Sequence, residues 1–184
     1  MLNVVLASRR LALRGGLVLG ALLGAATPLP VLANFVNFES HQIHPIEISP
    51  DGTRLAALNT PDGYLCIYQL GGVVPLLLHQ IPVGLEPVSL AWRTDDEIWV
   101  ANHLSDDVSI VNLTTQNVRA TLLVGDEPTD VIFAGNPVRA YVCISQEDAV
   151  KAYDPLNLAT PPIVIPIFGA DPRALARSRF NDRV

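Results

Sequence analysis

Cysteine and methionine are scarce in this 184-residue chain, which has two Cys and one Met, and Lys151 is its single lysine. Two cysteines exclude a disulfide framework. Cys66 and Cys143 are expected on sheets separated by a third sheet, and stacked sheets lie about 10 Å apart, beyond the reach of one disulfide bond. We therefore predict two free cysteines that pack as small apolar residues.

Basic residues are also few: the chain has 12 Lys and Arg against 18 Asp and Glu, a formal net charge of −6. Three of the arginines, Arg9, Arg10 and Arg14, lie in the first 33 residues. Without that segment nine basic residues face 18 acidic ones, which gives a net charge of −9. Because an acidic surface repels phosphate backbones, we expect no nucleic acid among the partners.

The motifs of several common catalytic and cofactor sites are missing. The chain has no Cys-x-x-Cys-His segment, so we expect it to attach no c-type haem, and no other cofactor is indicated. A Gly-x-Ser-x-Gly turn, a phosphate-binding loop and a His-Glu-x-x-His helix are absent as well. The sequence therefore assigns no catalytic residue and no metal ligand set.

A long membrane-spanning run is missing too, and the first 33 residues are typical of a signal peptide. Three arginines precede an apolar run at 17–26, and the segment ends Val31-Leu32-Ala33. The run is well short of the roughly 18 to 20 residues that span a bilayer. Ser8-Arg9-Arg10-Leu11-Ala12 is similar to a twin-arginine signal, although Ala12 replaces the usual Phe, so both export routes stay open. We predict a periplasmic or extracellular protein without a membrane span after cleavage.

The remaining sequence is rich in short strand patterns. Between Gly84 and Gly125 we expect four strands, at 88–92, 97–101, 107–113 and 118–124. They are rich in Val, Ile, Leu and Trp, which suit a pleated surface. The segments between them are rich in Asn, Asp, Ser and Thr, which favour turns. Four strands in about forty residues match the size of one β-propeller blade.

This four-stranded pattern recurs along the chain. A Gly-x-x-Pro turn occurs at 84–87, 125–128 and 169–172, and a degenerate copy, Gln42-Ile43-His44-Pro45, lies upstream. The prolines are 42, 41 and 44 residues apart. The second and third strands recur at the same period, which disfavours the alternative of a β-sandwich with irregular spacing. We predict blades at about 45–83, 87–124 and 128–168, and the start of a fourth at 172.

Two segments carry a family resemblance: Pro45 to Leu55, with its Ser-Pro-Asp-Gly turn, and Trp99 to Thr115, which begins Trp-Val-Ala-Asn. They resemble the YVTN-type β-propeller repeat, whose members are similar to lactonase-like and nitrite-reductase-like propellers. The third copy departs from the pattern, because Ala134-Gly135-Asn136-Pro137 replaces the Ser-Pro-Asp-Gly turn. The resemblance, from about Phe38 onward, implies an all-β propeller of four-stranded blades, incomplete here.

Three blades and the first strand of a fourth do not close a ring, since propellers typically have four to eight blades. Open end faces would expose apolar residues. We therefore interpret the chain as a fragment of a longer protein. Association of two or more copies is the alternative, so self-association is among the expected interactions.

Strand order predicts one rim of the propeller as the candidate site. The Gly-x-x-Pro turns and the connections between second and third strands lie at the same end of the blades. The candidate residues for a ligand or a cation are acidic or histidine: Glu47, Asp130, Glu86, Glu127, Asp171 and His103. Glu47 and Asp130 are expected at equivalent inner-strand positions facing the channel. Hard cations prefer several oxygen ligands, while the alternative is a merely solvated rim.

His103 is the histidine with the most base-like predicted setting, beside Asp106. The leading prediction of function is nevertheless an exported binding or interaction module without chemistry of its own. Its partner would be an unidentified protein or small ligand at the channel rim. Two alternatives stay open: a lactonase-like hydrolase, which the resemblance permits, and the propeller domain of a larger periplasmic redox protein.

Overall fold

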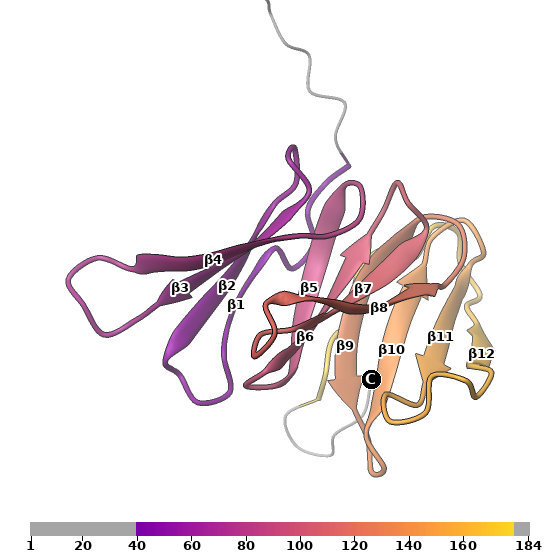
Figure 1. Ribbon diagram of the computed structural model, residues 1–184. Helices are drawn as coiled ribbons and strands as arrows, with labels where there is room; N and C mark the ends of the chain where they lie inside the picture. Colours follow the sequence, from indigo (N-terminus) through magenta and orange to yellow (C-terminus); the bar gives the residue numbers. More distant parts are fainter. Residues whose placement is uncertain (1–39, 179–184) are drawn as a thin grey trace, which may run out of the picture. The chain divides into compact units, whose positions relative to one another are not determined.

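The computed structural model describes residues 40–178, which form three four-stranded antiparallel sheets (Figure 1). The predicted signal peptide lies outside these residues. Within them no helix is long and apolar enough to cross a membrane. Each sheet is a meander in which every strand pairs with the next one along the chain. The all-β prediction, with four-stranded blades of an incomplete propeller, is confirmed.

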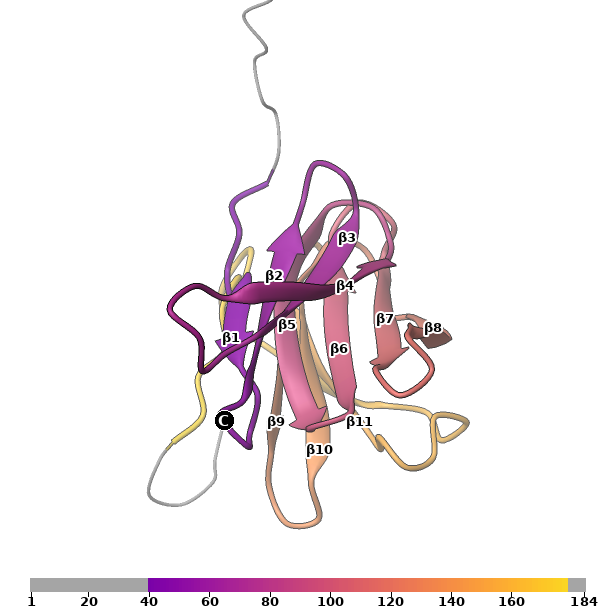
Figure 2. The ribbon, with the colours of Figure 1, turned by 60° about the vertical axis from the view of Figure 1, so that its left-hand side comes forward.

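We call the three sheets blades 1 to 3. Blade 1 contains β1 (Ile46–Ile48), β2 (Arg54–Asn59), β3 (Tyr64–Gln69) and β4 (Leu76–Pro82). Blade 2 contains β5 (Pro87–Thr94), β6 (Glu97–Asn102), β7 (Asp107–Asn112) and β8 (Asn117–Leu123). Blade 3 contains β9 (Pro128–Ala134), β10 (Arg139–Ile144), β11 (Ala149–Tyr153) and β12 (Ile163–Pro166). The first strands β1, β5 and β9 contact one another in series and form the inner side of the arrangement (Figures 1 and 2).

Apolar side chains fill the space between successive blades. Leu65 and Ile67 of blade 1 pack against Leu90 and Trp92 of blade 2. Between blades 2 and 3, Trp99 is fully buried and meets Phe133 edge to face, with the ring centroids 5.4 Å apart. Edge-to-face aromatic pairs contribute about 0.5–1.5 kcal/mol beyond the area that they bury. Blade 2 therefore has an apolar interface on each of its faces, one with blade 1 and one with blade 3.

Both cysteines are buried and free, as predicted. Cys66 lies on β3 and Cys143 on β10, so blade 2 separates them. Burial raises the pKa of the Cys143 thiol, helped by the nearby carboxylates of Asp130 and Asp171. A thiol with a raised pKa is a poor nucleophile, so Cys143 is not suited to act as one.

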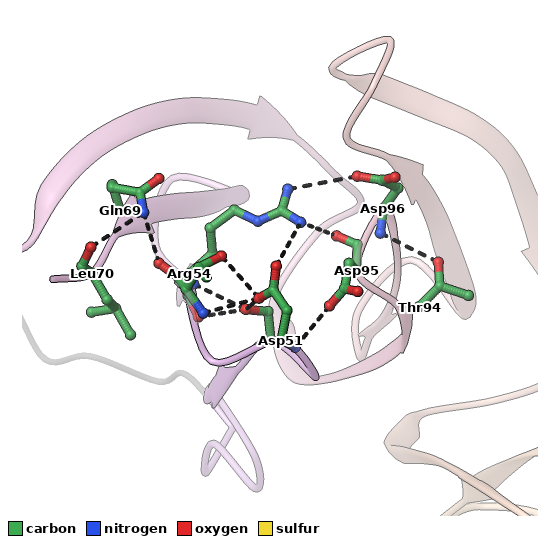
Figure 3. A network of polar contacts seen from close by, with 9 residues as sticks. Asp51, Arg54, Gln69, Leu70, Thr94, Asp95 and Asp96 are labelled. Carbon is green, nitrogen blue, oxygen red and sulfur yellow. Dashed lines mark hydrogen bonds and ion pairs between the residues drawn. The ribbon is translucent and has the colours of Figure 1, made fainter.

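The Ser-Pro-Asp-Gly turn joins blade 1 to blade 2 at one end of the sheets (Figure 3). Asp51 accepts hydrogen bonds from Ser49 Oγ at 2.6 Å and from the Thr53 amide at 2.9 Å, while its own amide donates to Asp95 Oδ1. These hydrogen bonds, that of Ser49 first, lower the pKa of Asp51 to about 2. Arg54 donates to the Asp95 carbonyl at 2.7 Å. The motif that carries the family resemblance thus serves as a blade-to-blade contact.

The segment 172–178, predicted as the first strand of a fourth blade, lies along β9 without forming a regular strand. Its polar backbone groups meet side chains instead of a ladder of backbone partners. The Pro172 carbonyl accepts from Thr129 Oγ at 3.3 Å and from Cys143 Sγ at 3.2 Å, and the Leu175 amide donates to Asp130 Oδ2 at 2.6 Å. The segment is therefore held beside blade 3 by side-chain contacts.

Candidate functional site

A cavity of 590 Å³ lies against the inner strands of all three blades. Residues of β1, β5, β9 and the segment 172–178 line it together. Its apolar walls include Ile46, Ile48, Leu90, Val131, Phe133 and Leu175. Four ionisable side chains also line it: His44, Glu47, Arg93 and Arg177. The site is thus a largely apolar hollow at the place where the inner strands meet.

Asp130 is fully buried next to this cavity and joins four separate parts of the fold. Its Oδ1 atom accepts from His44 Nδ1 at 2.9 Å, from Ser89 Oγ at 2.6 Å and from the Val131 amide at 2.9 Å. Its Oδ2 atom accepts from the Leu175 amide at 2.6 Å. A buried carboxylate is stable only when it is paired and hydrogen-bonded, and four donors meet that need here.

Glu47, the other inner-strand acid, is more exposed than Asp130. Its Oε2 atom accepts from the Trp92 amide of blade 2 at 3.1 Å. Partial burial raises its pKa, whereas the Trp92 hydrogen bond and the charges of His44 and Arg177 lower it. The carboxylate therefore connects blades 1 and 2 and faces the basic side chains of the cavity.

The predicted equivalence of Glu47 and Asp130 is wrong by two positions along the inner strand. Glu47 pairs with Ala56, three residues before the last residue of β2. Asp130 pairs with Cys143, one residue before the last residue of β10. A register shift after Pro128 inserts Thr129 as a bulge, which accounts for one of the two positions, and the β1–β2 ladder has no such shift. The other position arises because Pro128 lies opposite Ile144, the last residue of β10, whereas the Pro45 carbonyl accepts from the amide of Leu58, one residue before the end of β2. Counting from the prolines could not detect this, because a bulge adds a residue without advancing the register.

The predicted rim exists, and it brings three of the candidate residues together. Ser145 Oγ donates to Asp171 Oδ1 at 2.9 Å and lies 3.3 Å from Glu127 Oε2. His103 Nε2 lies 3.8 Å from the same Glu127 oxygen. The pKa of Asp171 is lowered by the hydrogen bonds from Ser145 and Arg173. The arrangement ties the connection before blade 3 to the connection that follows it.

The sequence predicted that His103 lies beside Asp106, but the two side chains do not pair. The His103 ring is buried, with Nδ1 3.4 Å from the Pro128 carbonyl and Nε2 facing Glu127. Asp106 Oδ1 accepts from the Glu127 amide at 3.1 Å instead. The positive φ of 59° at Asp106 turns its short side chain toward that amide. His103 is therefore enclosed by the rim instead of being open to a substrate.

Glu86 lies apart from these two groups, and its Oε1 atom accepts from the Ser40 amide at 3.0 Å. The residues before the three prolines share a backbone feature, since Glu86, Glu127 and Asp171 have φ values of 54°, 56° and 58°. Within residues 40–178 no group of three or more His, Cys, Asp or Glu side chains is arranged to hold a metal ion. The six candidates thus form separate sets, and cation binding stays a prediction.

The sequence reasoning missed His44 as a functional candidate. The residue lies in the degenerate copy of the turn, where it precedes Pro45, and its ring reaches Asp130, which is 86 residues away in the sequence. The signal that could have indicated it is the substitution of a histidine at a position that is acidic in the other three turns.

Comparison with known proteins gives the fold but not a family. No family model and no curated protein matches the chain. Among solved structures it is similar to the hydrazine synthase of Kuenenia stuttgartiensis, with 22% identity and a TM-score of 0.64 over 76% of this chain and 40% of that one. A putative 6-phosphogluconolactonase of Bacteroides uniformis has 17% identity and a TM-score of 0.58, over 72% of this chain and 46% of that one.

A protein of unknown function from Desulfotomaculum acetoxidans is also similar, with 14% identity and a TM-score of 0.52 over 65% of this chain and 40% of that one. The chain spans less than half the length of each of these structures. Structural similarity at such low sequence identity indicates a shared architecture but not a shared activity. With three four-stranded blades packed in series, the described chain has the fold of an incomplete β-propeller.

Proposed function

We propose that this chain is the ligand-binding propeller domain of an exported protein, and that it binds a small amphiphilic molecule in the inner-strand cavity. The observation that carries the proposal is the 590 Å³ cavity lined jointly by all three blades and the segment 172–178. Small-molecule sites usually have volumes of about 300–1,000 Å³, mostly apolar walls and a few polar groups that orient the ligand.

The wall chemistry supports a ligand with an apolar body and a polar end. Ile46 and Ile48 present side chains that are more than half exposed toward this side of blade 1. Glu47, Arg177 and His44 place acidic and basic groups at one part of the wall. An amphiphile would cover the isoleucines with its apolar part and place its polar end among these groups.

Export is supported by the first 33 residues, whose basic start, apolar run and Val31-Leu32-Ala33 ending are those of a signal peptide. Binding in the periplasm or outside the cell also agrees with the acidic composition, which favours solubility over contact with nucleic acid. We therefore propose export together with small-molecule binding.

The test is calorimetric titration of 4-nitrophenyl hexyl ether, a neutral amphiphile, into the full chain. We expect saturable binding that the substitution Ile46→Asp weakens by about tenfold or more, because a charge replaces apolar wall area. Val164→Asp is the matched control, since Val164 on β12 is as exposed as Ile46 and lies outside the cavity.

Two results would contradict the proposal. The first is the absence of saturable binding by the unsubstituted chain. The second is equal weakening by Ile46→Asp and Val164→Asp, which would mean that the ether adsorbs to exposed apolar strands in general.

A further inference from the structure

The contact between His44 and Asp130 has a chemical consequence beyond binding. Both oxygens of Asp130 accept hydrogen bonds from backbone amides, those of Val131 and Leu175, and an amide N–H can only donate. These amides and the Ser89 hydroxyl favour the ionised carboxylate, whose oxygens can only accept. His44 Nδ1, 2.9 Å from Oδ1, must therefore carry the proton of that hydrogen bond.

With the proton on Nδ1, the neutral His44 ring has its lone pair on Nε2. Nε2 has no hydrogen-bond partner among residues 40–178, and the side chain is 49% exposed. His44 is also one of the residues that line the cavity. An oriented imidazole with a free basic nitrogen, on a residue that lines a ligand-sized hollow, is the arrangement of a general base.

Ser89 does not act as a nucleophile in this arrangement. It is fully buried, and its hydroxyl donates to Asp130 Oδ1 at 2.6 Å. In a Ser-His-Asp triad the histidine lies between the serine and the acid, whereas here the acid lies between the serine and the histidine. The base therefore has only water to activate.

We propose that His44 is a general base that activates water for the hydrolysis of carboxylic esters with apolar acyl groups, held in the inner-strand cavity, with Asp130 as its positioning residue. This inference rests on the proposed binding function, because the same cavity holds the substrate. The apolar wall of Ile46, Ile48 and Leu90 receives the acyl chain.

The reaction balances without a further co-reactant. His44 Nε2 takes a proton from water as the water oxygen forms a bond to the ester carbonyl carbon. The bond between that carbon and the alcohol oxygen then breaks, and the leaving oxygen receives the proton from the His44 imidazolium. The products are the carboxylic acid and the alcohol, and the ring returns to its starting state.

The experiment uses the full chain and 4-nitrophenyl esters with acetyl and hexanoyl groups. We expect kcat/KM to be about tenfold higher for the hexanoyl ester, because each buried methylene adds to binding. His44→Gln should lower kcat by about a hundredfold or more, the usual contribution of a general base. His41→Gln, at an exposed histidine outside the cavity, is the matched control and should leave the rate unchanged.

Two further measurements separate chemistry from folding. Added imidazole should restore activity to His44→Ala, because a free base can occupy the emptied space, and no merely structural defect would be rescued in this way. Asp130→Asn should lower kcat more than it changes KM, since it misorients the ring without removing the wall. Mass spectrometry during turnover should find no acyl group on Ser89.

Hydrolysis that is no faster than in buffer, or that His44→Gln leaves unchanged, would overturn the inference, as would an acyl group on Ser89. If the hexyl ether binds in the cavity but the esters are not hydrolysed, the proposed function stands and the catalytic inference fails. If the ether does not bind, the proposed function itself fails.

Discussion

At the residue scale, single carboxylates connect one blade to the next. Glu47 accepts from the Trp92 amide of blade 2, and Asp130 accepts from the Leu175 amide of the segment after blade 3. Asp95 of blade 2 accepts from the Asp51 amide of blade 1. Hydrogen bonds to charged acceptors are stronger than those between neutral groups. Acidic residues thus hold neighbouring blades together, on the inner strands and at one end of the sheets.

The first prediction concerns Asp51, whose pKa of about 2 lies below its ordinary value of 3.8. Because the folded pKa is lower than the unfolded one, the stabilising effect of the ionised group is complete above that ordinary value and is lost as the pH falls toward 2. We expect Asp51→Asn to lower Tm at about pH 5 and the difference from the unsubstituted chain to shrink toward pH 2.

Differential scanning calorimetry across this pH range measures the effect. Asp126→Asn, at an exposed aspartate in the turn before blade 3, serves as the control and should show no such trend. A Tm difference for Asp51→Asn that grows as the pH falls would mean that the Ser49 and Thr53 hydrogen bonds do not hold the charged form.

At the scale of elements, the turns between second and third strands repeat one backbone geometry. The residue before the third strand has a positive φ in every blade: 69° at Gly63, 59° at Asp106 and 48° at Asp148. The two aspartates each accept from the amide of the residue before the next proline, Glu127 and Asp171. Glycine suits this turn because it adopts a positive φ without strain. Aspartate suits it because its side chain accepts a hydrogen bond from the next turn.

A substitution pair at Asp106 separates these two contributions. Both Asp106→Gly and Asp106→Ala lose the hydrogen bond to the Glu127 amide, but only alanine resists the left-handed conformation. We expect the glycine variant to be more stable than the alanine variant by about 1 kcal/mol, the lower end of the cost of that conformation for an L-residue. Denaturant unfolding measures the difference, and equal stabilities would show that the turn relaxes.

At the scale of the whole molecule, two inner-strand positions are buried in blades 2 and 3 but exposed in blade 1. Ile46 lies at the position of Leu90 and Val131, and its exposure is 57% against 1% and 0%. Ile48 lies at the position of Trp92 and Phe133, with 56% against 7% and 9%. In blades 2 and 3 these residues cover the preceding blade, so the free face of blade 1 is built for contact with another apolar surface.

We therefore expect the chain on its own to self-associate. Size-exclusion chromatography with light scattering should show oligomers or aggregates, and Ile46→Lys with Ile48→Lys should shift the population toward the monomer, because charges oppose burial of that face. Val73→Lys, at a fully exposed position in the β3–β4 connection, is the control. A monomer with a sharp cooperative melt would show that the three blades are self-sufficient.

Export is the second prediction at this scale. When the chain is expressed in a Gram-negative host, we expect cleavage after Ala33 and a mature N-terminus at Asn34. N-terminal sequencing of the periplasmic fraction checks this. Soluble protein in the cytoplasm with Met1 still in place would contradict the signal peptide.

Much of the strand layout could be predicted from sequence, because turns and alternation are local properties. The strands of blade 2, predicted at 88–92, 97–101, 107–113 and 118–124, lie within two residues of the observed bounds. Trp92, Trp99 and Tyr153 pack between blades, since a large ring in a strand needs a facing surface. The bulge at Thr129 was not predictable, because register depends on the partner strand.

The sequence by itself determined the repeat, the four-stranded blades, the rim and the two free cysteines, all of which follow from periodic patterns and spacing. Only the tertiary structure decided where the site lies. Asp130 is hydrogen-bonded to residues 41 to 86 positions away in the sequence, namely His44, Ser89 and Leu175. Contacts between successive inner strands bring them together, and no local pattern in a chain encodes which residues of different repeats will meet.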